Sequence, residues 1–156
     1  MQATNAAAVT TVARSKRTVR AIAAAESSRE SGHSRASAEI SLFAESGLCV
    51  ASRVQIAGTF ASRFIGLLSR QYLEDSEGLL LKSGGSIHTF GMRFGIDVLF
   101  LDRQMSILKI VRRLKPWRLA IAPRKTCLVL EIASGRAAAL GLRNDVRLLQ
   151  QEMPKR

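Results

Sequence analysis

Cysteine, proline and aromatic residues are all scarce in this sequence, and no long apolar run is present. The 156 residues include 2 cysteines and 3 prolines, and aromatic residues make up 5%. Cys49 and Cys127 stand far apart and match no metal-ligand spacing, so we expect two small buried side chains and no disulfide. Apolar runs such as Val98–Leu101 are far too short to span a bilayer, which excludes an integral membrane segment.

What the sequence has in excess is positive charge. Lysine and arginine number 24 against 12 acidic residues, for a net charge of +12, while 47% of the residues are hydrophobic. This length and composition predict one soluble globular domain with a tail rather than two domains. A domain of this size needs no disulfide or metal to fold, and we assign it no cofactor and no metal.

The first 46 residues differ in composition from the rest of the chain. Acidic residues are absent until Glu26, while basic residues gather at Arg14–Arg20, after the weakly apolar stretch Ala6–Val9. That order disfavours a cleavable secretory signal, although the composition suits an organellar transit peptide. We favour a disordered or weakly helical extension, or a start codon assigned too far upstream. The expected location is the cytoplasm, with organellar targeting or peripheral association with the cell envelope as alternatives.

The remaining residues predict short strands and two short helices. Alternating apolar residues in Leu48–Ile56 indicate a half-buried strand, and helical spacing of apolar residues predicts a helix at Thr59–Ser69. A second helix is expected from a Ser134 cap through Leu140, ended by Gly141. The other expected strands are Glu77–Leu81, Ile87–Phe94, Asp97–Leu101, Ser106–Val111, Thr126–Ala133 and Val146–Leu149.

This pattern predicts an α+β, mostly β domain, a small curled sheet or open barrel of about six or more short strands with two short helices. We expect the domain at residues 47–150, between an extension at residues 1–46 and a C-terminal tail at residues 151–156.

One motif identifies a family. The stretch Gly85–Asp102, with the sequence GSIHTFGMRFGIDVLFLD, resembles the signature of the DUF192 (UPF0127) family of uncharacterised prokaryotic-type proteins. Supporting similarities are Arg63–Leu68, Glu77–Leu80, Leu130–Glu131 and Gly135, whereas Gly95 stands where proline often occurs. The resemblance implies a small, self-contained, barrel-like domain, and it supplies no catalytic residues.

The motif also carries the first candidate site. In a regular strand His88, Phe90, Met92 and Phe94 would share one face. His88 in that setting suits a metal ligand, a proton shuttle or a ligand-gripping group, but more often such a histidine is buried and satisfied by the backbone. A soft-metal site formed by His88 with Met92, Cys49 and Cys127 is a weaker alternative, because methionine at such a position usually fills the core.

Carboxylates supply the remaining candidates. Asp97 precedes an apolar run and Glu131 lies inside a strand, so each needs a partner such as an arginine or a turn amide. Convergence of either with His88 in a cleft would instead make an acid/base pair. The candidate cleft residues are His88, Met92, Asp97, Glu131, Arg63 and Glu77.

A basic stretch forms the second candidate site. No acidic residue occurs between Asp102 and Glu131, and this interval also contains the only tryptophan. Such a stretch could grip phosphates, anionic lipid or an acidic protein, or it could be an ordinary solvated face. Its members are Lys109, Arg112, Arg113, Lys115, Trp117, Arg118, Arg124 and Lys125.

Three functions are compatible with these residues. The leading hypothesis is a non-enzymatic accessory module, monomeric or weakly oligomeric, that presents a small cleft near His88 and Asp97 to an unknown ligand or protein partner. We expect this module to serve a larger assembly, for which the cell envelope is one location. The second is an acid/base enzyme that uses His88 with Asp97 or Glu131. The third is binding of nucleic acid or another polyanion through the basic stretch.

Overall fold

The computed structural model describes residues 39–57, 67, 70–82 and 84–152. The extension expected at residues 1–46 therefore lies outside the described residues up to residue 38, as does the helix expected at Thr59–Ser69 apart from Leu67. In the part of the chain that the structure describes, none of the helices has the length and apolar character that spanning a membrane requires.

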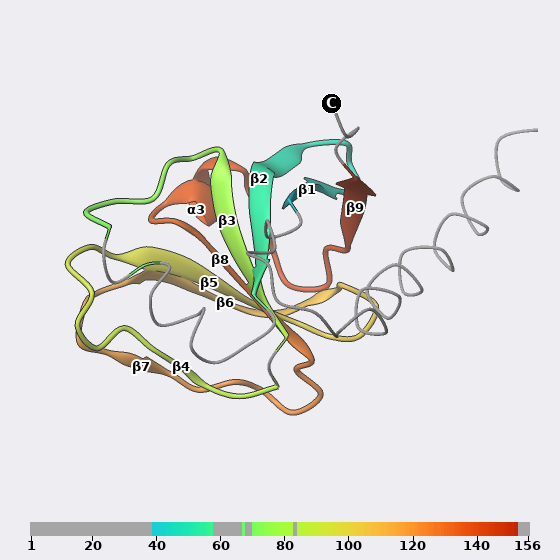
Figure 1. The fold of residues 1–156 in the computed structure, drawn as a ribbon. Coiled ribbons are helices and arrows are strands. Elements are labelled where there is room, and N and C mark those ends of the chain that lie inside the picture. The colour runs from blue at the N-terminus through green and yellow to red at the C-terminus, as the bar shows by residue number, and fades with distance from the viewer. Residues whose placement is uncertain (1–38, 58–66, 68–69, 83, 153–156) are drawn as a thin grey trace, which may run out of the picture. The chain divides into compact units, whose positions relative to one another are not determined.

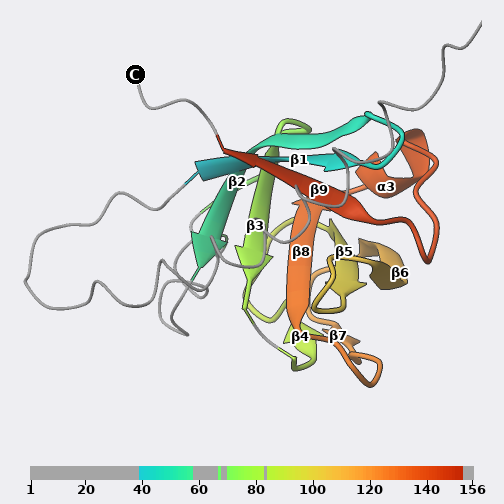
Figure 2. The same ribbon diagram turned by 90° about the vertical axis from the view of Figure 1, so that its right-hand side faces the viewer.

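A seven-stranded curled sheet forms the body of the domain (Figures 1 and 2). Its strands follow the order β6-β5-β8-β3-β2-β1-β9, in which β2 and β3 are parallel and all other neighbours antiparallel. The bounds are β1 Glu39–Ala44, β2 Cys49–Ala57, β3 Glu77–Leu81, β5 Ile96–Leu101, β6 Ile107–Leu114, β8 Leu128–Ala133 and β9 Leu148–Glu152.

Two small elements complete the fold. Strands β4 (Ile87–His88) and β7 (Leu119–Ala120) pair as a separate two-stranded sheet, and the short helix α3 (Arg136–Ala139) follows β8. Both ribbon views place β4 and β7 at the end of the sheet away from β1 and β9 (Figures 1 and 2).

The outer strands of the sheet curl toward each other. Ser106, just before β6, forms an isolated bridge with Arg147, just before β9. The Ile107 amide donates to the carbonyl of Val146 at 2.9 Å, and the Leu148 amide to that of Met105 at 2.9 Å. The result is a mostly β, half-barrel domain, which confirms the fold class predicted from the sequence.

Apolar side chains cover both faces of the central strands. Every residue of β5 and β8 is buried, because alternate side chains enter two different core clusters. On β5, Leu99 and Leu101 join the cluster shared with β1, β2 and α3, whereas Val98 and Phe100 join the cluster that β4 and β7 cover. Burial on both faces explains the unbroken apolar runs of these strands, which lack the alternation of a half-exposed strand.

The sheet extends beyond both ends of the domain expected at residues 47–150. Strand β1 lies before Gly47, and Gln151 and Glu152 pair with Ser41 and Ile40. Register shifts interrupt the pairing of β1 with β2, and Ser41 is buried with its hydroxyl donating to the Ser52 carbonyl at 2.8 Å. The boundary expected at residue 47 rests on composition, which does not reveal a short, bulged strand with a buried serine.

The strand expected at Ile87–Phe94 is also shorter in the structure. It ends at His88, because the chain turns through Gly91, whose φ of 81° favours glycine, and the Met92 amide donates to the Thr89 carbonyl at 3.2 Å. The turn separates the four residues expected on one face: Met92 is buried in the core, whereas Phe90 is 47% exposed.

Candidate functional site

Asp97 is a structural clasp in the interior of the domain. Its side chain is fully buried, and its Oδ1 accepts hydrogen bonds from the amides of Arg113, at 2.7 Å, and Gly135, at 3.0 Å. Its Oδ2 accepts the amide of Ala137 at 2.8 Å. A buried carboxylate is stabilised by several such charge-assisted bonds. Asp97 thereby ties the irregular part of β6 to the start of α3.

The start of α3 depends on this distant carboxylate rather than on the serine expected to cap it. Gly135 occupies the N-cap position with a φ of 89°, and no side chain bonds there as a local cap. Asp97 supplies an acceptor to the free amides of the first turn instead. Gly141 ends the helix as expected, with a φ of 61° and with the Leu142 amide donating to Ala137 in a Schellman arrangement.

The two buried carboxylates point to opposite faces of the sheet. Asp97 is opposite Ile132 in the pairing of β5 with β8, whereas Glu131 is opposite Val98. Ile132 and Val98 belong to different core clusters, so the carboxylates cannot meet in one cleft. With Asp97 enclosed by backbone amides, the arrangement does not support the acid/base pairing of Asp97 with His88.

Glu77 lies in a small group of charged residues at the start of β3. Its Oε2 accepts a hydrogen bond from Arg70 at 2.8 Å and from the amide of Glu74 at 3.2 Å, while Arg53 lies 4.0 Å from Oε1. Burial alone would raise the pKa of Glu77, but the Glu74 amide and the two arginines outweigh it and lower the pKa from 4.5. These contacts are those of a structural ion pair.

A small pocket of about 40 Å³ adjoins this group, with room for a few water molecules. Its lining includes Arg53, Arg70 and Glu77, together with apolar side chains from Leu67, Leu73 and neighbouring residues. Arg63, which was expected to join the candidate cleft, lies outside the described residues.

The residues considered for a soft-metal site are dispersed. Met92 packs in the cluster beneath β4 and β7, whereas Cys127 packs against the cluster on the other face. Cys49 and Cys127 are both free thiols. Among the described residues, no group of three or more histidine, cysteine or acidic side chains could hold a metal ion.

Exposed apolar side chains gather instead around β4 and β7. Phe90 is 47% exposed, Trp117 63%, Leu119 58% and Ile121 65%. The His88 and Phe90 rings stack with centroids 5.1 Å apart, and Phe90 stacks on Trp117 at 6.1 Å. We call these five residues the hairpin surface. Large apolar side chains exposed as a group mark interaction sites more often than single ones do.

Thr89 anchors this surface from beneath. Its hydroxyl is buried, donates to the Lys115 carbonyl at 2.8 Å and accepts the Arg118 amide at 3.0 Å, thereby bridging the two ends of the turn that carries Trp117. The Thr89 carbonyl accepts the Trp117 amide at 3.0 Å, and the Thr89 amide donates to the Arg118 carbonyl at 2.9 Å. The turn is therefore fixed by four hydrogen bonds to Thr89, the residue directly after β4.

Trp117 adopts a backbone conformation that glycine would adopt more easily. Its φ is 59°, directly after Pro116. A bulky residue in this region raises the energy of the folded state by about 1–3 kcal/mol. An indole that is mostly exposed recovers little of that energy through burial, so its presence at this position is not explained by packing.

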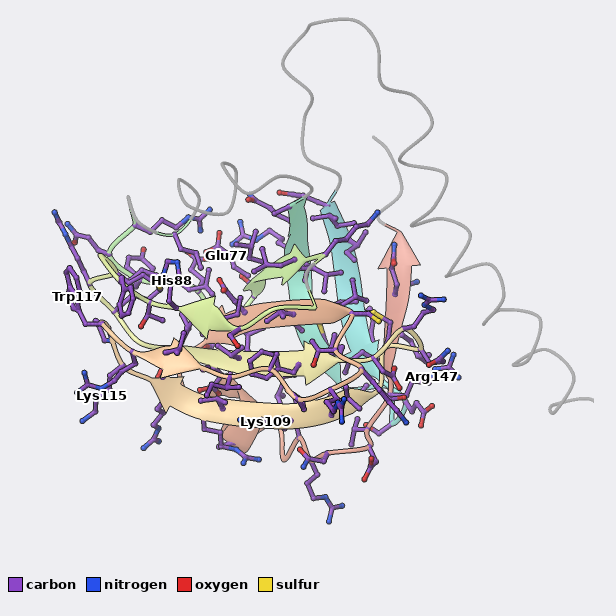
Figure 3. All side chains as sticks on the ribbon, turned by 90° about the horizontal axis from the view of Figure 1, so that it is seen from below. Glu77, His88, Lys109, Lys115, Trp117 and Arg147 are labelled. Atoms are coloured by element: carbon purple, nitrogen blue, oxygen red, sulfur yellow. The ribbon has the colours of Figure 1, made fainter. Side chains whose placement is uncertain are left out.

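The cations of the basic stretch divide into those that contact residues of the hairpin surface and those that do not. Lys109 donates to the Ile121 carbonyl at 3.0 Å and Arg118 to the Trp117 carbonyl at 3.1 Å, both on the hairpin surface. Arg112 donates instead to the Leu142 carbonyl at 2.8 Å, outside that surface. Lys115 is exposed at the same end of the domain as Trp117 and His88, and Arg147 lies at the opposite end (Figure 3). Cations thus flank the hairpin surface.

Sequence reasoning included His88 and Trp117 but missed Thr89, Phe90, Leu119 and Ile121 as a group. Phe90 was assigned to a buried strand face, and Leu119 and Ile121 lie about 30 positions further along the chain. One available signal was the pair of acid-free segments that contain them, between Glu77 and Asp97 and between Asp102 and Glu131.

Comparison with known proteins identifies the family. The family model DUF192, described as "Uncharacterized ACR", matches residues 41–149. This chain belongs to the DUF192 family. The resemblance inferred from the Gly85–Asp102 motif is thereby confirmed, and no biochemical activity accompanies it.

Curated relatives include UPF0127 proteins from Thermococcus and Pyrococcus. One from Thermococcus sibiricus is 33% identical over 87 residues, which are 53% of this chain and 56% of that protein, so the chain spans little more than half of this relative. One from Pyrococcus furiosus is 32% identical over 98 residues, covering 61% of this chain and 84% of that protein.

Solved structures share the fold. A protein of unknown function from Novosphingobium aromaticivorans superposes with a TM-score of 0.64 at 24% identity, covering 81% of this chain and 96% of that protein. A putative transcription regulator from Sinorhizobium meliloti gives a TM-score of 0.63 at 24% identity, covering 77% of this chain and 98% of that protein. At this identity, the similarity concerns the fold alone.

Proposed function

We propose that this DUF192 chain is a non-enzymatic binding module that contacts an anionic partner through the hairpin surface. The observation that carries the proposal is Trp117, which is 63% exposed and held at a φ of 59°. Four hydrogen bonds to Thr89 hold the turn in place. A fixed, exposed indole is typical of a residue that makes contact with a partner.

The surrounding residues support contact over a surface rather than in a cleft. Met92 and Asp97, around which a cleft was expected, are 7% and 0% exposed. His88 remains part of the site through its stacking on Phe90. The neighbouring lysines and arginines, with no acid between Asp102 and Glu131, favour a partner of negative charge.

The test is Trp117→Gly, which removes the indole and suits the positive φ. Three anionic probes would be titrated with the full chain: vesicles containing anionic lipid, a single-stranded oligonucleotide and a polyglutamate peptide. We expect at least one probe to bind and the variant to bind it at least about ten-fold more weakly. Its free energy of unfolding should be unchanged or higher by up to about 1 kcal/mol, because strain is relieved.

Tyr72→Ala is the matched control, since Tyr72 is 66% exposed outside the hairpin surface. It should leave binding unchanged. The proposal fails if no probe binds, or if Trp117→Gly binds as tightly as the original chain. A large loss of stability in Trp117→Gly would also contradict it, because the indole would then serve the fold.

A further inference from the structure

We infer that the anionic partner is a lipid bilayer, and that the apolar side chains of the hairpin surface enter its headgroup region. This inference depends on the proposed function, because it names the partner of the same surface. A surface that enters the headgroup region needs exposed apolar side chains, cations beside them and backbone amides that are already hydrogen-bonded.

The composition favours lipid over nucleic acid. Bases stack on aromatic rings, and the hairpin surface offers Phe90 and Trp117 for that purpose. Its two most exposed side chains besides Trp117 are Ile121 and Leu119, at 65% and 58%, and these have no ring on which a base could stack. Aliphatic side chains gain from contact with acyl chains, and tryptophan is enriched at membrane interfaces.

The charge is arranged for a shallow contact. Exposed cations border the apolar side chains within the sequence: Arg93 follows Phe90 closely, and Lys115 and Arg118 flank Trp117. The segments that build the surface carry no acidic residue. Each lysine or arginine near an anionic membrane strengthens binding about five-fold, so several of them add to the apolar contribution.

The backbone of the turn is already satisfied. The Trp117 amide donates to the Thr89 carbonyl, and the Trp117 carbonyl accepts from the guanidinium of Arg118. The Arg118 amide is bonded to the Thr89 hydroxyl. The Trp117 and Arg118 amides therefore need no water as a partner when the turn enters a region with little water, where an unpaired amide would oppose insertion.

The experiment uses the tryptophan of the turn as its reporter, because the chain contains only one. The full chain would be mixed with vesicles of phosphatidylcholine containing about one third phosphatidylglycerol, and with vesicles of phosphatidylcholine alone. We expect Trp117 emission to move to shorter wavelength on the anionic vesicles, with weaker binding on the neutral ones. High salt should weaken the binding.

Two pairs of variants locate the contact. Leu119→Ser combined with Ile121→Ser should weaken partition at least about ten-fold, because two aliphatic contacts are lost. Leu149→Ser, at a position 45% exposed on β9, should have no effect. Lys115→Gln should weaken partition about five-fold, whereas Arg143→Gln, exposed elsewhere, should change it less than Lys115→Gln does. Circular dichroism and the thermal midpoint would verify that each variant is folded.

Each remaining outcome overturns the inference. If the chain sediments with vesicles while Trp117 emission and the hairpin variants show no effect, another part of the chain binds lipid. If vesicles do not bind but the oligonucleotide or polyglutamate does, with the same dependence on Leu119 and Ile121, the proposed function stands and the bilayer is the wrong partner. If no probe binds, both the inference and the proposed function fail.

Discussion

Asp97 and two residues of the hairpin surface, His88 and Phe90, lie in the same DUF192 motif and follow opposite rules. Asp97 is a charged side chain that is fully buried and bonded to three backbone amides. Nearby, Phe90 is an apolar side chain that is 47% exposed. The first is explained by the fold and the second is not, so the motif combines a structural part with a part available for contact.

The largest expected effect comes from breaking the clasp. Asp97→Ala should lower the free energy of unfolding by about 3–5 kcal/mol, because three amides lose their buried acceptor. Urea unfolding measures the difference. Asp102→Ala is the matched control, since Asp102 also accepts two backbone amides, of Gln104 and Ser106, but is only partly buried. The free energy of unfolding of Asp102→Ala should fall by only about 1 kcal/mol. An equal decrease in both variants would show that the buried Asp97 contributes no more than the partly buried Asp102.

A smaller effect is expected where the two regions are linked, at Thr89. Thr89→Val keeps the shape of the side chain but removes the hydroxyl that bridges the Lys115 carbonyl and the Arg118 amide. The free energy of unfolding should therefore fall by about 1–2 kcal/mol. The Trp117 fluorescence anisotropy should fall, because its turn is released.

Thr126→Val provides the control for Thr89. Thr126 is also buried, and its hydroxyl donates to the Pro123 carbonyl at 2.7 Å. This variant should lose some stability without changing the anisotropy of Trp117. If both variants change the anisotropy alike, Thr89 is not specific to the turn.

The smallest effect is expected at Glu77, a carboxylate neutralised by arginines rather than by backbone amides alone. Because its folded pKa is lowered, Glu77 stabilises the domain above its unfolded pKa and loses that contribution as the pH falls through the folded pKa. Glu77→Gln should thus lower stability at neutral pH by about 1 kcal/mol or less, and the difference should shrink in acid.

Urea midpoints measured at neutral and acidic pH test this dependence. Glu74→Gln is the control, because the Glu74 side chain is 49% exposed and its contact with Arg53 lies in solvent. If the difference in urea midpoint between Glu77→Gln and the original chain grows in acid, the lowered pKa of Glu77 does not stabilise the folded domain.

The regular central strands were the part of the fold that could be predicted from sequence. The apolar run Val98–Leu101 lies in the buried strand β5, and the strand expected at Thr126–Ala133 is the buried strand β8, which begins at Leu128. The bulged β1 could not be predicted in the same way, because its buried Ser41 depends on the Ser52 carbonyl, a partner on another strand.

The candidate site was only partly predictable for a similar reason. Periodicity assigned Phe90 to the same face as Met92, and one turn at Gly91 separates them. That Asp97 would reach Ala137, and that Leu119 would pair with His88, follows from strand pairing between distant segments. Such pairing depends on the whole sheet, which local patterns do not specify.

The pairing of β1 with β9 also has a consequence for biosynthesis. Ile40, in the first strand of the described sheet, pairs with Glu152, in its last, so β1 meets its outer neighbour only when the chain up to Glu152 has emerged from the ribosome. Until then the edge of β1 lacks its partner and can pair with another nascent chain. The seven-stranded sheet is therefore completed only after all of its other strands have been synthesised.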